Sequence, residues 1–183
     1  MKSVKIRRNK AVIVVIDIQE RLLPAMKNQE DIANKAAMLI RGGRILGTPI
    51  LVTEQYPKGL GKTVSQIQEA LVKFEPIEKT SFSVLGEPNF VEALKAFNCE
   101  DVIICGIESH VCVEQSALDL LDQGYRVYII EDATGSRSNI DKKYAGRRMV
   151  EAGCVGTTVE AVLFEMVGDA KDPCFKEISN LVK

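Results

Sequence analysis

The sequence predicts a three-layer α/β fold, in which a six-stranded, mostly parallel sheet carries helices on both faces. Short β-branched apolar runs alternate with helical patterns from residue 11 to residue 167. The strand segments are almost continuously apolar, as expected of strands buried on both faces. The chain has 183 residues, of which 46% are hydrophobic and 27% charged, and this fits one domain with one core. We therefore expect residues 1–183 to form a single domain.

Each element is predicted from its apolar pattern and its boundary residues. The first strand is an unbroken apolar run, and a Gly-Thr-Pro sequence ends the first helix after Leu46. Pro88 fits the first turn of a helix, and Gly124 fits the end of one. The expected strands are 11–17, 50–53, 75–79, 101–106, 126–131 and 154–157; the expected helices are 32–46, 64–73, 89–97, 111–123, 141–151 and 158–167. The tail, 169–183, has no clear pattern.

The charge balance and the cysteines argue against several classes of partner. The net charge is −1 and the pI is near 6.0, which gives no field for binding phosphate backbones, so we expect no nucleic-acid partner. The basic stretch 2–10 is interpreted as a solvated edge. No apolar run approaches the ~20 residues of a membrane helix, so we expect no membrane partner. Five cysteines without a C-x-x-C pattern indicate free thiols in a reducing compartment, and hence a cytoplasmic protein.

Reactive side chains fall near the carboxyl ends of three predicted strands. In an open parallel sheet, ligands bind beyond these ends, at the point where the strand order reverses. With the common order 3-2-1-4-5-6, that point lies between the first and fourth strands. Asp17 ends the first strand, Lys79 ends the third, and Cys112 lies near the start of the helix after the fourth. We expect the three side chains on one rim.

Cys112 is the candidate nucleophile. A thiol at a helix N-terminus and near an ammonium such as that of Lys79 is shifted toward the thiolate. A carboxylate such as that of Asp17 can accept the thiol proton and later protonate a leaving group. Each residue also has a plainer interpretation: Cys112 as a small buried hydrophobe, Asp17 as the cap of a turn and Lys79 as a solvated loop lysine. Cys105, inside an apolar strand, and the other three cysteines are interpreted as structural.

The sequence does not indicate a cofactor or a metal. A dinucleotide site needs a glycine-rich turn after the first strand, and none follows Asp17. The glycines at 42 and 43 lie late in a predicted helix. His110 is the single histidine and the cysteines are scattered, which does not fit the usual ligand set of catalytic zinc.

Three motifs, in this order, resemble those of the isochorismatase-like hydrolase superfamily. They are Val-Ile-Asp17-Ile-Gln19, Glu78-Lys79-Thr-Ser-Phe82-Ser and Gly106-Ile-Glu-Ser-His-Val-Cys112-Val. The resemblance covers nearly the whole chain. The stretch Thr53-Glu-Gln-Tyr-Pro-Lys-Gly-Leu60 is similar to the isochorismatase-domain subgroup.

The resemblance implies a triad of Asp17, Lys79 and Cys112. It also implies a cis peptide between Ile107 and Glu108, which would aim the Glu108 N–H at the site and form an oxyanion hole with the Cys112 N–H. Relatives are often oligomers, so we expect a homo-oligomer. Two departures narrow the reaction. The loop after the second strand lacks the histidines of the metal-binding nicotinamidase branch. Isochorismatases that cleave a vinyl ether lack the nucleophilic cysteine, whereas this chain has Cys112.

The hypothesis from the sequence is a cysteine-dependent hydrolase that cleaves a C–N bond of a small amide or imide through a thioester. Gln19, Tyr56, Phe82 and His110 are candidates for the pocket lining, and His110 is equally interpreted as a solvent-facing residue. The alternative is a binding or scaffold protein with weak or no turnover. A third interpretation, a redox-sensing thiol, needs a resolving cysteine, and none is evident near Cys112 in the sequence. The sequence does not specify the substrate.

Overall fold

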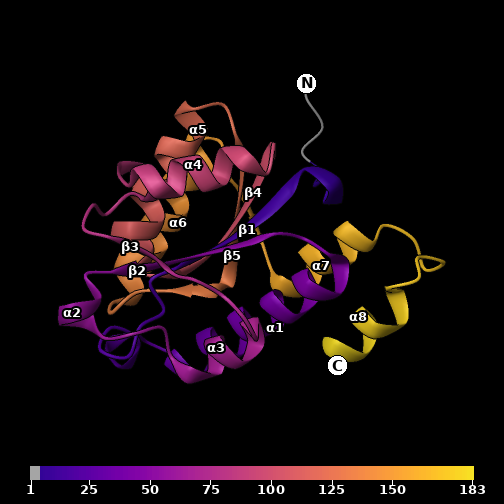
Figure 1. Ribbon diagram of the computed structural model, residues 1–183, viewed down its shortest axis with the longest axis horizontal. Coiled ribbons are helices and arrows are strands. Elements are labelled where there is room, and N and C mark those ends of the chain that lie inside the picture. The colour runs from indigo at the N-terminus through magenta and orange to yellow at the C-terminus, as the bar shows by residue number, and fades with distance from the viewer. Residues whose placement is uncertain (1–4) are drawn as a thin grey trace.

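Six strands form one sheet in the order β3-β2-β1-β4-β5-β6, and each neighbouring pair is parallel. The computed structural model, shown in Figure 1, describes residues 5–183, so the first part of the basic stretch 2–10 lies outside the described residues. The predicted fold class and strand order are confirmed. The strands are β1 (Ala11–Ile16), β2 (Ile50–Gln55), β3 (Ile77–Lys79), β4 (Asp101–Ile107), β5 (Arg126–Gly135) and β6 (Val155–Thr157).

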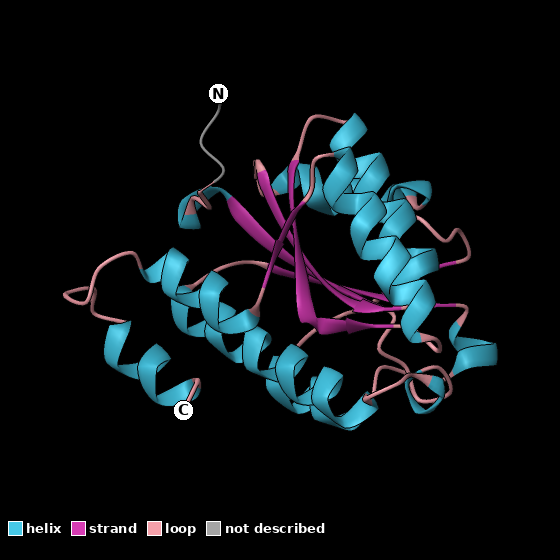
Figure 2. Ribbon diagram, turned by 180° about the vertical axis from the view of Figure 1, so that it is seen from behind, coloured by secondary structure: helices cyan, strands magenta, loops and turns pink. Residues whose placement is uncertain are grey.

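Helices cover both faces of the sheet (Figure 2). Helices α1, α3, α7 and α8 supply side chains to the apolar cluster on one face, and α4, α5 and α6 to the cluster on the other. The α-helices are α1 (Gln29–Leu46), α2 (Pro57–Leu60), α3 (Ser65–Leu71), α4 (Pro88–Ala96), α5 (Glu114–Asp122), α6 (Asn139–Ala152), α7 (Val159–Val167) and α8 (Phe175–Leu181).

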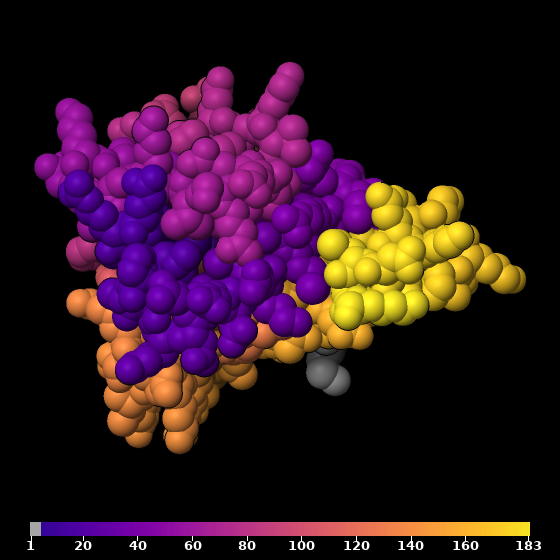
Figure 3. Space-filling view, turned by 90° about the horizontal axis from the view of Figure 1, so that it is seen from below, coloured from indigo at the N-terminus to yellow at the C-terminus, as the bar shows by residue number. Residues whose placement is uncertain are grey.

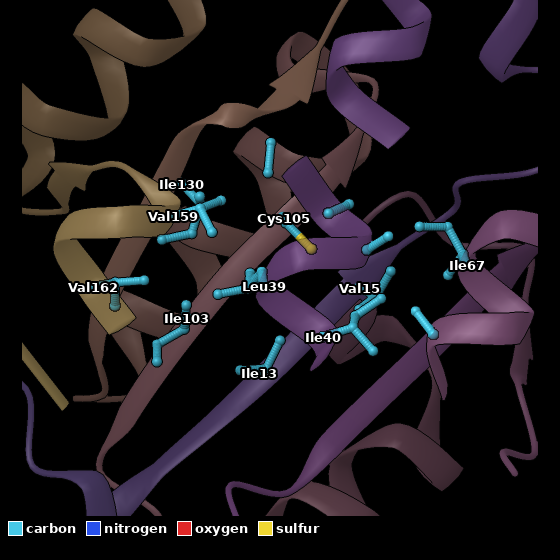
Figure 4. Close-up of a cluster of buried hydrophobic side chains, with 14 of the residues drawn as sticks. Ile13, Val15, Leu39, Ile40, Ile67, Ile103, Cys105, Ile130, Val159 and Val162 are labelled. Carbon is cyan, nitrogen blue, oxygen red and sulfur yellow. The ribbon is translucent and has the colours of Figure 1, made fainter. Parts of the chain in front are cut away.

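The central strands are buried on both faces because their alternate residues enter different clusters. Ile13 and Ile103 belong to the cluster beneath α1, whereas Val12 and Val102 belong to the opposite one. Figure 4 shows the first cluster, with Cys105 of β4 among aliphatic side chains. This packing explains why β1 is apolar throughout, without the alternation of a half-exposed strand.

Two adjacent glycines let α1 pack closely on its neighbours. A Cβ atom on Gly42 would lie 2.4 Å from a methyl of Leu163, and one on Gly43 would lie 2.4 Å from a methyl of Ile13. Both positions are in the helix rather than in a phosphate-binding loop. The glycines therefore serve the contact between α1, α7 and the sheet.

The largest departure from the predicted elements is in the tail. Residues 175–181 form α8, whose Ile178 is fully buried in the cluster beneath α1. Arg8, from the basic N-terminal stretch, pairs with Asp172 at 3.2 Å. Figure 3 shows this C-terminal segment in yellow at one end of the molecule. The tail lacked a sequence signal because α8 is short and depends on a few tertiary contacts.

Candidate active site

Asp17 lies just beyond β1 and is completely buried. Its backbone is left-handed, with φ of 55°, and its N–H donates to the Thr53 carbonyl at 3.3 Å. Its two carboxylate oxygens have different partners. Thr53 Oγ1 donates to Oδ1 at 2.7 Å, and Lys79 Nζ donates to Oδ2 at 2.7 Å. The carboxylate is thus held in one orientation at the carboxyl ends of the strands.

Lys79 is the last residue of β3, where it pairs in register with Gln55 of β2. Its side chain, like that of Asp17, has no exposed surface. Besides Asp17, the ammonium contacts Gln55 Oε1 at 2.7 Å and the carbonyls of Ser81 and Phe82 at 3.2 and 3.1 Å. A buried ion pair of this kind is tolerated only when its geometry is good and further hydrogen bonds satisfy its charges. The interpretation of Lys79 as a solvated loop lysine is therefore wrong.

Gly106 brings the segment that carries Cys112 against the end of β1. A Cβ atom at this position would lie 2.2 Å from the Ile16 carbonyl oxygen, and the φ of 140° favours glycine. The peptide bond between Ile107 and Glu108 is cis. A π-helical turn, Ser109–Val113, then leads into α5, so α5 itself begins after Cys112.

Cys112 is 6% exposed and interacts with both members of the ion pair. Burial raises the pKa of its thiol to about 12; the charge of Asp17 adds to the rise, and that of Lys79 opposes it. The structure therefore differs from the expectation of a resting thiolate, because the turn that carries the sulfur packs into an apolar cluster. Cys154 has nearly the same exposure, 5%, and burial alone raises its pKa to about 12.

Two side-chain contacts join the Cys112 turn to the loop after β5. Arg137 Nε lies 2.5 Å from Glu108 Oε1, and His110 Nδ1 lies 3.0 Å from Ser136 Oγ. His110 is half-buried, so it is neither fully solvated nor enclosed. These contacts hold the turn on the side away from β1.

The remaining predicted pocket residues are placed differently from one another. Gln19 is fully buried, and its amide bonds the backbone of Gln55 and Gly61. Tyr56 and Phe82 are about half exposed, and each is bonded to Lys79 through its backbone. The Tyr56 N–H donates to the Lys79 carbonyl, and the Phe82 carbonyl accepts from the Lys79 ammonium. Tyr56 also lines a cavity of about 340 Å³ at the ends of β2 and β3. The other residues that line it are Pro57, Lys58, Glu78, Lys79, Thr80 and Glu87.

Thr53 and Gln55 are site residues that the sequence analysis missed. Both lie at the carboxyl end of β2 and bond directly to the Asp17–Lys79 pair. A signal was available, since polar residues two apart at the end of an apolar strand project to the same side. Among residues 5–183, no three His, Cys, Asp or Glu side chains are grouped so that they could hold a metal ion. No helix in that range is long and apolar enough to cross a bilayer.

The fold and the site define a class of protein: a parallel α/β chain with a buried carboxylate–ammonium pair beside a cysteine at the carboxyl ends of its strands. Comparison with known proteins places it within that class. The chain belongs to the isochorismatase family, because the family model of the isochorismatase domain matches residues 11–161. The resemblance found in the motifs is confirmed.

Individual relatives cover most of the chain. It is 42% identical over 174 residues to isochorismatase domain-containing protein 1 of Danio rerio, across 94% of this chain and 61% of that protein. The chain thus spans about three fifths of the length of the first curated relatives that it matches. The structure of MAR1 ribonuclease from Caenorhabditis elegans has a TM-score of 0.92 at 40% identity, covering 97% of this chain and 92% of that one. The YcaC gene product of Escherichia coli, described as an octameric hydrolase of unknown specificity, has a TM-score of 0.90, covering 100% of this chain and 96% of that one. Because the identity is 23%, this likeness shows the fold alone.

Proposed function

We propose that the chain is a cysteine-dependent hydrolase that cleaves the C–N bond of a small amide through a thioester. The proposal rests on the fully buried Asp17–Lys79 pair, 2.7 Å apart, whose two charges shift the pKa of the Cys112 thiol in opposite directions. A fold does not define a reaction, so the argument depends on the site. Membership of the isochorismatase family, whose fold is that of hydrolases, supports the reaction class.

The proposed first half-reaction forms a thioester. Because burial keeps the Cys112 thiol protonated, Asp17 accepts its proton while the sulfur attacks the substrate carbonyl carbon. The resulting oxyanion accepts hydrogen bonds from the N–H groups of Glu108 and Cys112. Asp17 then gives the proton to the leaving nitrogen as the C–N bond breaks. The products of this half are a free amine and a Cys112 thioester.

The second half-reaction restores the enzyme. Asp17 takes a proton from water, whose oxygen attacks the thioester carbon, and the C–S bond breaks. The proton returns to the Cys112 sulfur, so the net change is amide plus water to acid plus amine. Lys79 holds Asp17 in place throughout and stabilises the negative sulfur. Tyr56, Phe82 and His110 are the candidates for substrate contacts, and no cofactor or metal takes part in the proposal.

Cys154 offers a matched control for the nucleophile, because it is equally buried and has a similarly raised pKa, but no comparable charge partners. We expect iodoacetamide near neutral pH to label Cys112 selectively and Cys154 slowly, as read by peptide mass spectrometry. A screen of small amides should give an acyl adduct on Cys112, and Cys112→Ala should abolish turnover while Cys154→Ala retains it. Amide turnover that survives Cys112→Ala would show that the nucleophile is wrong.

A binding protein with weak or no turnover is the second candidate, and the 6% exposure of Cys112 favours it. Slow and uniform labelling of all five thiols would support this candidate over the hydrolase. The C. elegans relative is described as a ribonuclease, so RNA is a substrate to test beside the amides. RNA cleavage that is lost in Asp17→Asn would replace the amide proposal.

We also propose that the chain forms a homo-oligomer in the cytoplasm. Helix α6 carries three of the strongly exposed large apolar side chains, Ile140, Tyr144 and Val150, which is the pattern of a covered surface. All five cysteines are free thiols, which suits a reducing compartment. Light scattering should give a mass above one chain, and Tyr144→Asp should lower it. A monomer at all concentrations would overturn the proposal.

A further inference from the structure

Two side chains of β2 hold the Asp17–Lys79 pair from one side. Thr53 and Gln55 are two residues apart on the strand, so their side chains project to the same face. Thr53 Oγ1 donates to Asp17 Oδ1, and Gln55 Oε1 accepts from Lys79 Nζ, each at 2.7 Å. Gln55 is in turn fixed through its own Nε2, which donates to the Thr80 carbonyl at 2.8 Å. Each member of the ion pair thus has its own polar partner on β2.

Proton counting separates the roles of the two charged groups. The Lys79 ammonium has three N–H bonds. Four acceptors surround it within 3.2 Å, namely Asp17 Oδ2, Gln55 Oε1 and the carbonyls of Ser81 and Phe82. Every proton is already used, so Lys79 can turn toward a substrate only by giving up one of these bonds. Lys79 therefore acts as a fixed charge, and proton transfer falls to Asp17.

Asp17 is held differently, because its oxygens receive one neutral and one charged donor. The Lys79 ammonium occupies one position on Oδ2, and the Thr53 hydroxyl occupies one position on Oδ1. We propose that Thr53 is a positioning residue that fixes the orientation of the Asp17 carboxylate beside Cys112. This inference rests on the proposed hydrolase function.

The test needs no substrate, because it follows the pH dependence of Cys112 alkylation by iodoacetamide. In the native chain, the plot of labelling rate against pH should have one rising limb, along which Cys112 becomes reactive. Thr53→Val removes the hydroxyl at nearly constant shape. We expect the limb to move to higher pH, because an Asp17 carboxylate without its Thr53 bond is no longer held where it accepts the thiol proton. Thr53→Ser restores the hydroxyl and should return the limb to its native position. A purely structural role would lower stability without moving the limb.

Thr63 provides a matched control. Its hydroxyl also donates to a buried carboxylate, Glu54 Oε1, at 2.7 Å, and neither residue belongs to the proposed machinery. Thr63→Val should lower stability and leave the limb in place. If Thr53→Val does not fold, the pair Thr53→Ala and Thr53→Ser makes the same comparison with smaller side chains.

The possible outcomes separate the two proposals. Selective labelling of Cys112 with a limb that does not move in Thr53→Val or Thr53→Ala would overturn the role of Thr53 and leave the hydrolase proposal intact. A native chain whose Cys112 is labelled no faster than Cys154 would instead overturn the hydrolase proposal. A limb that moves in Thr63→Val as much as in Thr53→Val would show a general effect of core polarity, and would also overturn the role of Thr53.

Discussion

Replacing Lys79 by methionine tests whether the Asp17–Lys79 pair determines the stability of the fold as well as its chemistry. Both side chains have no exposed surface, so the variant leaves the Asp17 carboxylate buried beside an apolar group. Removing one partner of a buried pair costs about 3–5 kcal/mol. Thr53 still donates to Asp17, and half-buried Gln55 can turn to water, so we expect about 3 kcal/mol. In a chain of this size, that lowers the Tm by roughly 6–12 °C.

Urea unfolding followed by circular dichroism at pH 7 measures the change. Lys143→Met, at an exposed lysine of α6, is the control and should stay within about 0.5 kcal/mol of the native chain. The double variant Asp17→Asn with Lys79→Met contains neither buried charge, so it should lose less than the sum of the single variants. A loss below about 1 kcal/mol, or strict additivity in the double variant, would refute the reasoning.

Two further predictions concern β4. Gly106→Ala places a Cβ atom 2.2 Å from the Ile16 carbonyl oxygen and should lower the free energy of unfolding by more than about 4 kcal/mol. Gly124 also has a positive φ but nothing within 4 Å, so Gly124→Ala should lower it by only about 1–2 kcal/mol. Thermal melts that rank the two variants equally would contradict this. Burial raises the pKa of Cys105 to about 12 from 9.0, so its contribution to stability is full below pH 9 and declines as the pH rises toward 12. The stability difference between the native chain and Cys105→Ala should therefore narrow from pH 9 to pH 11 in urea unfolding, and a constant difference would contradict the prediction.

The sequence predicted the sheet well because the strands are buried on both faces. Each strand is then a compact apolar run, and boundaries were correct to within a few residues except in β5, which continues to Gly135. The extension follows a register shift between Ile104 and Gly106, where β5 pairs again with β4 further along. A shift of this kind arises from tertiary pairing and leaves no periodic signal. Helix α8 was missed for a similar reason.

The candidate site was predicted unevenly. Asp17, Lys79 and Cys112 were found because topology places strand ends on one edge, and this needs only the strand order. The sequence left the burial of Cys112 open between two interpretations, because it depends on how its turn packs against side chains distant in sequence. Thr53 and Gln55 were overlooked, although their spacing on β2 indicated a shared face. The Gln55 bond depends on the position of Lys79, two strands away from β1, and the Thr53 bond depends on that of Asp17.

The contacts of the two end segments have a consequence for handling the protein. Arg8, just before β1, bonds the Leu46 carbonyl at the end of α1, and Cys174 contacts the neighbouring Ile45 carbonyl. Both segments therefore gather at the amino edge of the sheet, opposite the ends where Asp17 and Lys79 lie. Immobilising the chain on a surface through its C-terminal segment would leave the reactive edge turned outward, open to a ligand arriving from solution.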